Sequence, residues 1–241
     1  GLLAAAFVVS WLALRFALRL SPDRNLVTTV FATALLFRVI LLPSTPIQEI
    51  DIYRYLWDGC VGAAECCPYP FEPQRILSGV NDPELAAHQH DPSLQKLAAI
   101  VAHDAQIKNI VDTIHYSELP SPYPPVSQFV FAKTSNFVPF GATAELRLFI
   151  FKCVLVAFDL ATLGLVMALL SMAGQHPAWS LAYGWCPLVL KEFANSGHLD
   201  SIAIFFTTLA LAIVSWGWQA SAATRWQWVV TGSAAAALAR R

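Results

Sequence analysis

Charged side chains are scarce in this sequence. Only 13% of its 241 residues are Asp, Glu, Lys or Arg, whereas an ordinary soluble domain carries roughly a quarter. Hydrophobic residues make up 56% of the chain, and the mean hydropathy is +0.54. This composition argues against a soluble globular domain and is typical of a membrane protein.

A basic surface and a metal-binding cysteine pattern are also missing. The formal net charge is −1, so the chain lacks the surplus of Lys and Arg that nucleic-acid-binding domains carry, and we expect no nucleic-acid partner. The five cysteines show no paired C-x-x-C spacing. They are either small apolar side chains, or Cys60 forms a disulfide with Cys66 or Cys67 in an oxidising compartment.

Long apolar runs dominate what is present. A bilayer core of about 30 Å requires roughly 20 mostly apolar residues in a helix. Residues 26–42, 148–173 and 199–218 meet this requirement. Segments 126–140 and 179–190 are weaker and predict shallow or short helices, the second of them re-entrant. The fold class predicted is therefore all-α, a polytopic membrane helical bundle.

The first run, residues 1–14, is expected to be a truncated span, and the chain as a whole resembles an internal fragment. No basic region precedes this run, which argues against a signal peptide. Arg15, Arg19 and Arg24 follow it in a short turn. Because short cytoplasmic loops are enriched in Lys and Arg, this turn is expected in the cytoplasm.

A polar stretch, residues 44–122, separates the apolar runs and is predicted to form a large external loop. It holds eleven acidic but four basic side chains. Helical spacing appears at 52–64 and at 83–102, where an apolar stripe suits a helix on a membrane surface or against spans. Residues 123–241 supply further transmembrane and re-entrant helices, so that 1–241 form one membrane-embedded domain. The stripe consists of Leu94, Leu97, Ala98 and Val101.

The loop begins with PIQEIDIYRYLWDG, residues 46–59, which is rich in ionisable groups. In a helix from residue 51, Asp51, Arg54 and Asp58 share one polar face. A carboxylate at the start of this helix can act as general base on a sugar hydroxyl. Alternatively, Asp51 caps the helix by accepting hydrogen bonds from its first-turn amides. The spacing allows both interpretations.

Several segments together resemble the GT-C superfamily of integral-membrane glycosyltransferases. They are EIDIYRYLWDG, PYPFEP, SPYPP and YGWCPLVLKEFANSGHLDSIAIFF, spread over roughly residues 30–220. They are most similar to the bacterial mannosyltransferase-like branch that uses polyprenyl-phosphate sugars. This resemblance implies transfer of a hexose, with mannose expected, from a polyprenyl-phosphate donor to a glycan or glycolipid acceptor with inversion. It also implies a bacterial plasma membrane location with the active site on the external face.

In that superfamily an acidic pattern in the first external loop supplies the catalytic base. Glu49 and Asp51 occupy the matching positions, with Asp51 as the base. The two carboxylates are also able to hold a divalent cation with substrate phosphate, since Mg²⁺ needs few protein ligands. A metal requirement stays open at this point.

Further residues are predicted to bind substrate. A lipid-phosphate leaving group needs cations or hydrogen-bond donors. Such side chains flank the FANSG turn, residues 193–197, and occur in the stretch 46–59. Structural alternatives exist for each: snorkelling at a membrane interface, helix capping, or shaping of a cleft by the prolines beside the tyrosine. The predicted substrate-binding residues are Arg54, Tyr123, Lys191, Glu192, His198 and Asp200.

A transporter is the main alternative function. Arg38, Lys152 and Asp159 lie within the predicted spans and would be its coupling residues. Transporters commonly show paired internal repeats, and the sequence contains none.

Overall fold

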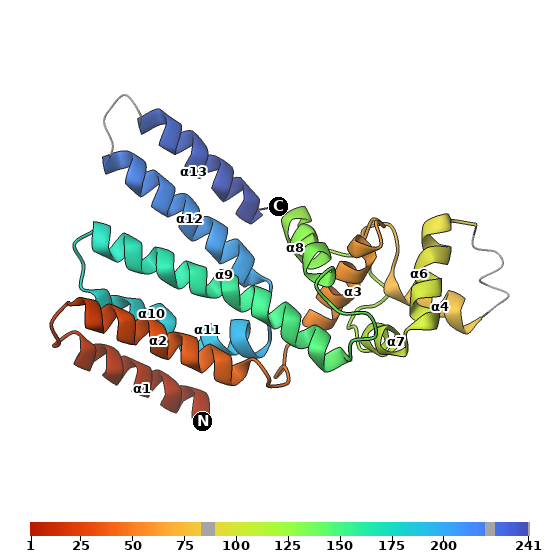
Figure 1. The fold of residues 1–241 in the computed structure, drawn as a ribbon, viewed down its shortest axis with the longest axis horizontal. Coiled ribbons are helices and arrows are strands. Elements are labelled where there is room, and N and C mark those ends of the chain that lie inside the picture. The colour runs from red at the N-terminus through yellow and green to blue at the C-terminus, as the bar shows by residue number, and fades with distance from the viewer. Residues whose placement is uncertain (83–89, 220–224, 241) are drawn as a thin grey trace. The chain divides into compact units, whose positions relative to one another are not determined.

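The computed structural model describes residues 1–82, 90–219 and 225–240, and in these ranges all regular structure is helical. The predicted all-α class is confirmed. The helix predicted at 83–102 lies partly outside the described residues. The α-helices labelled in Figure 1 are α1 Leu2–Ala17, α2 Arg24–Leu41, α3 Ile52–Ala63, α4 Pro73–Asn81, α6 Pro92–His103, α7 Ala105–Asp112, α8 Pro125–Ser135, α9 Ala144–Met172, α10 Leu181–Gly184, α11 Pro187–Val189, α12 Asp200–Gln219 and α13 Arg225–Arg240. The 3-10 helix η1 Pro177–Ser180 precedes α10, and the π-helix η2 Leu190–Asn195 follows α11.

Three of these helices are long and apolar enough to cross a membrane: Arg24–Leu41, Ala144–Met172 and Asp200–Trp218. They match the three spans predicted from hydropathy, with ends that differ by a few residues. The first helix, α1, is shorter at 16 residues. It exposes large apolar side chains such as Trp11 and Phe16, as a helix facing lipid does. The membrane class predicted from composition is therefore supported.

The chain divides into two compact units, residues 1–47 with 155–241 and residues 48–154. The first unit contains α1, α2, most of α9 and everything that follows. The second unit contains nearly all of the predicted external loop together with α8. Each unit has its own core and its own polar network.

A buried ion pair joins α2 to α9 within the first unit. Arg38 Nε lies 2.5 Å from Asp159 Oδ2, Arg38 Nη2 lies 3.2 Å from Oδ1, and neither side chain is exposed. Arg38 Nη1 also donates to the carbonyls of Ala34 and Gly184, and the Tyr183 hydroxyl donates to Asp159. Charges at membrane depth are costly unless they are paired and hydrogen-bonded. This bonding favours a structural role for the pair over a transport role.

The segment predicted as one short helix at 179–190 is a series of short pieces instead. Pro177 and Pro187 each begin a new piece, because proline has no amide hydrogen to donate to the preceding turn. Residues 190–195 then wind as a π-helix. Breaks of this kind release backbone carbonyls, and in lipid each of these requires a donor from neighbouring protein.

Hydrogen bonds in both directions connect the broken segment to neighbouring elements. Besides the ion-pair network, the Ser10 hydroxyl donates to the Trp185 carbonyl at 3.0 Å. The Asn195 side chain donates to the Thr45 carbonyl at 2.8 Å and accepts from the Ile47 amide at 3.0 Å. The broken segment is thereby fixed to α1 and to the chain that leaves α2.

The second unit has an apolar core of its own, built by α3, α4, α6 and α7. The stripe predicted on the third of these helices is part of it: Leu94, Leu97 and Val101 are at most 1% exposed. The expectation that the stripe faces a membrane surface or other spans is wrong, because the core of the loop itself covers it. Helices α4 and α7, which the sequence did not indicate, complete this core. Its members are Trp57, Val61, Ile76, Leu94, Leu97, Val101, Ile107, Val111 and Ile114.

Two glycines let α3 approach α8 closely. A Cβ added at Gly59 would lie 2.7 Å from the carbonyl oxygen of Phe131, and one added at Gly62 would lie 2.7 Å from the Cβ of Ala132. Both distances are shorter than real Cβ contacts, so a side chain at either position would push the helices apart. This contact fixes α3, the helix that begins after Asp51, against α8.

The ion pair of the first unit generates a stability prediction. Arg38→Met should lower the unfolding midpoint of the intact protein in detergent, because Asp159 is left as a buried charge without its counter-ion. Removal of one partner of a buried pair typically costs about 3–5 kcal/mol. Thermal unfolding of the purified protein measures the change.

Two matched variants sharpen this test. Arg24→Met removes the same charge from an exposed position on the same helix and should leave the midpoint unchanged. The double variant Arg38→Met, Asp159→Leu removes both charges and should recover much of the lost stability. A wild-type midpoint for Arg38→Met alone would contradict the assigned role.

Candidate functional site

Asp51 stands at the N-cap of α3, yet its side chain accepts no hydrogen bond from the first turn of that helix. Its φ of −57° and ψ of −22° are helical, whereas a capping residue usually has an extended backbone. Asp23, Asp91 and Asp104 do cap their helices, with oxygen-to-nitrogen distances of 2.9, 2.8 and 2.9 Å. The capping interpretation of Asp51 is therefore wrong.

Asp51 instead lines a cavity of about 260 Å³ in the second unit. This volume is close to the lower end of the range for small-molecule sites, about 300–1,000 Å³. Arg54 and Tyr123, two of the predicted substrate-binding residues, line the same cavity. The structure thus brings three predicted site residues together. The other lining residues are Ile50, His115, Tyr116, Leu119, Pro120 and Pro122.

A buried polar network holds Arg54 in place. Arg54 Nε donates to Asp58 Oδ1 at 2.9 Å, and the two residues are 5% and 1% exposed. The other oxygen of Asp58 accepts from the Ser121 hydroxyl and, at 2.7 Å, from the Gln128 side-chain amide. Burial raises the pKa of Asp58, although Arg54 and these hydrogen bonds act in the opposite direction. Two of the three residues of the predicted polar face, Arg54 and Asp58, are therefore buried and bonded to each other.

One nitrogen of the Arg54 guanidinium makes no hydrogen bond to the described residues. Nη1 donates to the Leu119 carbonyl at 3.0 Å, whereas Nη2 is buried and has no hydrogen-bond partner among the described residues. A buried donor without an acceptor costs about 1–3 kcal/mol. Arg54 therefore combines a place in the cavity lining with an unsatisfied buried donor.

Tyr123 is held by aromatic contacts. Its ring meets that of Tyr55 edge to face at 5.0 Å, and Tyr55 stacks on Phe131 at 4.7 Å. Burial and then the negative charge of Asp51 raise the pKa of Tyr123 above its ordinary value. The hydroxyl therefore stays protonated at physiological pH, so that it is able to donate a hydrogen bond.

Glu49, the second predicted carboxylate, is exposed and does not line the cavity. Within residues 1–82, 90–219 and 225–240, no group of three or more His, Cys, Asp and Glu side chains is placed to hold a metal ion. A divalent cation held between Glu49 and Asp51 does not fit this arrangement, because one carboxylate faces the cavity and the other faces solvent.

The remaining predicted residues form two ion pairs in the first unit. Lys191 Nζ lies 3.0 Å from Glu192 Oε1, and His198 Nδ1 lies 3.1 Å from Asp200 Oδ2. The His198 amide donates to the Glu192 carbonyl at 2.9 Å, which connects the two pairs through one turn. A carboxylate accompanies each basic group, so the positive charge available for a phosphate is partly neutralised.

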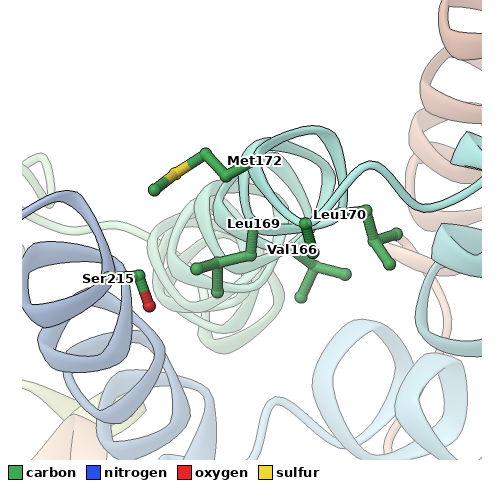
Figure 2. A pocket seen from close by; sticks show the side chains of 6 residues that line it. Val166, Leu169, Leu170, Met172 and Ser215 are labelled. Carbon is green, nitrogen blue, oxygen red and sulfur yellow. The ribbon is translucent and has the colours of Figure 1, made fainter. Parts of the chain in front are cut away.

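A larger cavity of about 450 Å³ has a different character. Figure 2 shows Leu169 and its neighbours on α9 together with Ser215 on α12. The walls are apolar except for that hydroxyl, and both helices are candidate spans. A lining of this kind suits lipid acyl chains better than a sugar, so the cavity beside Asp51 is the candidate site. The apolar residues that line the larger cavity are Val166, Leu169, Leu170, Met172 and Ala173.

Besides apolar lining residues, four polar residues of the site were not predicted: His115, Tyr116, Ser121 and Gln128. Gln128 has a readable signal, since Ser127 and Gln128 interrupt an otherwise apolar stretch after the prolines and a polar side chain there requires a buried partner. No local pattern connects His115 or Tyr116 to the cavity, because both lie far from Asp51 in sequence and tertiary packing places them in the lining.

Comparison with known proteins identifies the family. No curated protein and no solved structure gave a significant match to the chain. A family model does match, over residues 2–240, and its description is alpha-(1->6)-mannopyranosyltransferase, N-terminal domain. This match covers nearly the whole chain and agrees with the predicted mannosyltransferase-like branch. The chain belongs to the MptA_B family of alpha-(1->6)-mannopyranosyltransferases and is a membrane glycosyltransferase.

Proposed function

We propose that the chain transfers mannose from a polyprenyl-phosphate donor to a hydroxyl of a glycan or glycolipid acceptor, with inversion and with Asp51 as general base. The observation that carries this proposal is the position of the Asp51 carboxylate. It leaves the first turn of its own helix uncapped and lines a cavity together with Arg54 and Tyr123.

The chemistry needs one base and no general acid. Asp51 takes the proton of the acceptor hydroxyl while the acceptor oxygen forms a bond to the anomeric carbon. The bond between that carbon and the phosphate oxygen breaks on the opposite face of the ring, so the configuration inverts, as in inverting glycosidases where water is the nucleophile. The lipid phosphate leaves as a stable anion and requires no proton.

Asp51→Asn should lower kcat by about 10²–10⁴-fold, the usual contribution of a general base. The unfolding midpoint should stay close to the wild-type value, because asparagine keeps the size of the side chain and its ability to form hydrogen bonds. The measurement is transfer from labelled polyprenyl-phosphate-mannose by the intact protein in detergent, where no gradient exists for a transporter.

Two exposed carboxylates of the second unit serve as matched controls. Glu49→Gln removes the neighbouring charge and Glu65→Gln removes a distant one, and neither residue lines the cavity. Both variants should keep near-normal activity. Wild-type turnover by Asp51→Asn would reject the base role, and a loss in Glu49→Gln equal to that in Asp51→Asn would point to a shared carboxylate function.

Lys191 and His198 are proposed to bind the lipid phosphate of the donor, with Glu192 and Asp200 positioning them. Hydrogen bonds to charged groups contribute about 1.5–3 kcal/mol, so Lys191→Gln should raise the donor KM by about 10-fold or more. The acceptor KM should not change. Lys133→Gln, an exposed lysine outside this cluster, is the control, and an unchanged donor KM in Lys191→Gln would remove Lys191 from the donor site.

The second unit is proposed to face the outside of a bacterial plasma membrane, as the arginine-rich turn before α2 indicates. All five cysteines are free thiols, so the disulfide alternative is not realised. Cys67 is exposed, whereas burial raises the pKa of Cys60 to about 11 and keeps that thiol unreactive. Cys67 is therefore a native reporter of orientation.

A membrane-impermeant maleimide should label Cys67 in intact cells, and Cys67→Ser should lose most of that label. A cysteine introduced by Arg19→Cys in the Cys67→Ser background should react only after permeabilisation, because Arg19 lies in the turn predicted to be cytoplasmic. The reverse pattern would place the cavity of Asp51 on the cytoplasmic side and overturn the proposed external site.

A further inference from the structure

We infer that the cavity beside Asp51 binds the acceptor rather than the donor phosphate: it holds a neutral sugar ring against Tyr116, with Arg54 donating to one of its oxygens. This inference rests on the proposed function of Asp51 and deepens it. Three observations carry it: the exposed ring of Tyr116 on a strained backbone, the charges of the lining residues, and the buried Arg54 Nη2, which has no hydrogen-bond partner among the described residues.

Tyr116 has a strained backbone and an exposed side chain. Its φ is 54° and its side chain is 73% exposed. A non-glycine residue in the left-handed region is costly, and a side chain that is 73% exposed gains little from burial. Its ring contact is with His115, another residue of the cavity lining. Strain retained at the edge of a cavity is typical of functional sites.

Neighbouring bonds impose the conformation of Tyr116. The Leu119 amide donates to the Tyr116 carbonyl at 3.0 Å, and the Gln74 amide donates to the Ser117 carbonyl at 2.9 Å. On one side Ile114 is anchored in the apolar core at 7% exposure. These bonds hold the backbone of Tyr116, a residue that lines the cavity, in place. An aromatic face offers a sugar ring an apolar surface for its C–H groups.

The charges of the lining argue against a phosphate. The positive charge of Arg54 is already matched by Asp58, 2.9 Å away and buried with it. Besides Arg54, His115 is the one basic side chain among the lining residues, and the Asp51 carboxylate would repel a phosphate. A neutral hydroxylated ring meets neither obstacle.

Arg54 supplies a directional contact for such a ring. Its Nε and Nη1 are used by Asp58 and Leu119, which leaves the buried Nη2 for a ligand oxygen. This assignment revises the role expected for Arg54, which was stabilisation of the leaving phosphate. Arg54 then positions the acceptor whose hydroxyl Asp51 deprotonates.

The test separates acceptor binding from donor binding in the intact protein, with a neutral alkyl mannoside as acceptor. Tyr116→Ala should raise the acceptor KM by about fivefold to tenfold, the scale of one aromatic contact. The donor KM and kcat should stay within twofold of wild type. Tyr116→Phe keeps the ring and should behave as wild type.

A second variant separates binding from folding. Tyr116→Gly should raise the unfolding midpoint, since glycine adopts a positive φ without strain, yet it should lose acceptor affinity as Tyr116→Ala does. Inorganic phosphate should not compete with the mannoside.

Three outcomes would overturn the inference: a change in the donor KM alone, no change in either KM, or competition between phosphate and mannoside. The first and third would place the donor in this cavity, and the second would make Tyr116 a membrane-interface anchor. The base role of Asp51 is judged separately, by the loss of kcat in Asp51→Asn.

Discussion

The need to satisfy every polar group inside a bilayer explains most of the first unit. Arg38 and Asp159 lie 121 residues apart in sequence and form an ion pair with no exposed surface. Neither charge is tolerable in a span without the other. The same arginine donates to the Gly184 carbonyl, so the pair also stabilises the broken segment after α9. A segment with proline breaks and a π-helix is stable there because neighbouring side chains replace its missing backbone bonds.

The second unit contains a similar buried arginine–aspartate pair, with one difference. Arg54 pairs with Asp58 and donates to the Leu119 carbonyl, just as Arg38 pairs with Asp159 and donates to the Gly184 carbonyl. All three nitrogens of the Arg38 guanidinium donate hydrogen bonds, whereas one buried nitrogen of Arg54 has no partner among the residues that the structure describes. The first arrangement is complete and suits a structural connection. The second is incomplete in a residue of the cavity lining, which is consistent with the binding role that we propose for Arg54.

The sequence was informative where one local signal decided the structure. Hydropathy located the three long spans, and helical spacing located α3, because both depend on residues that are close in sequence. Partners could not be predicted: nothing local connects Arg38 to Asp159 or Gln128 to Asp58, since tertiary packing decides which buried polar groups meet. The short helices α4 and α7 were missed for a related reason. Their stability comes from a shared core and their local patterns are weak.

Asp51 shows most clearly where local reasoning ends. An aspartate before a helix predicts a cap, and Asp23, Asp91 and Asp104 follow that rule. Asp51 departs from it, and its own backbone is already helical. The Tyr53 and Arg54 amides donate instead to the Ile50 and Asp51 carbonyls, at 3.1 and 2.8 Å. A carboxylate committed to those amides would be a poor base, since hydrogen bonds to its charged form weaken its affinity for a proton. A helical backbone at Asp51, which goes with the absence of a side-chain cap, is therefore compatible with the base role that we propose for this carboxylate.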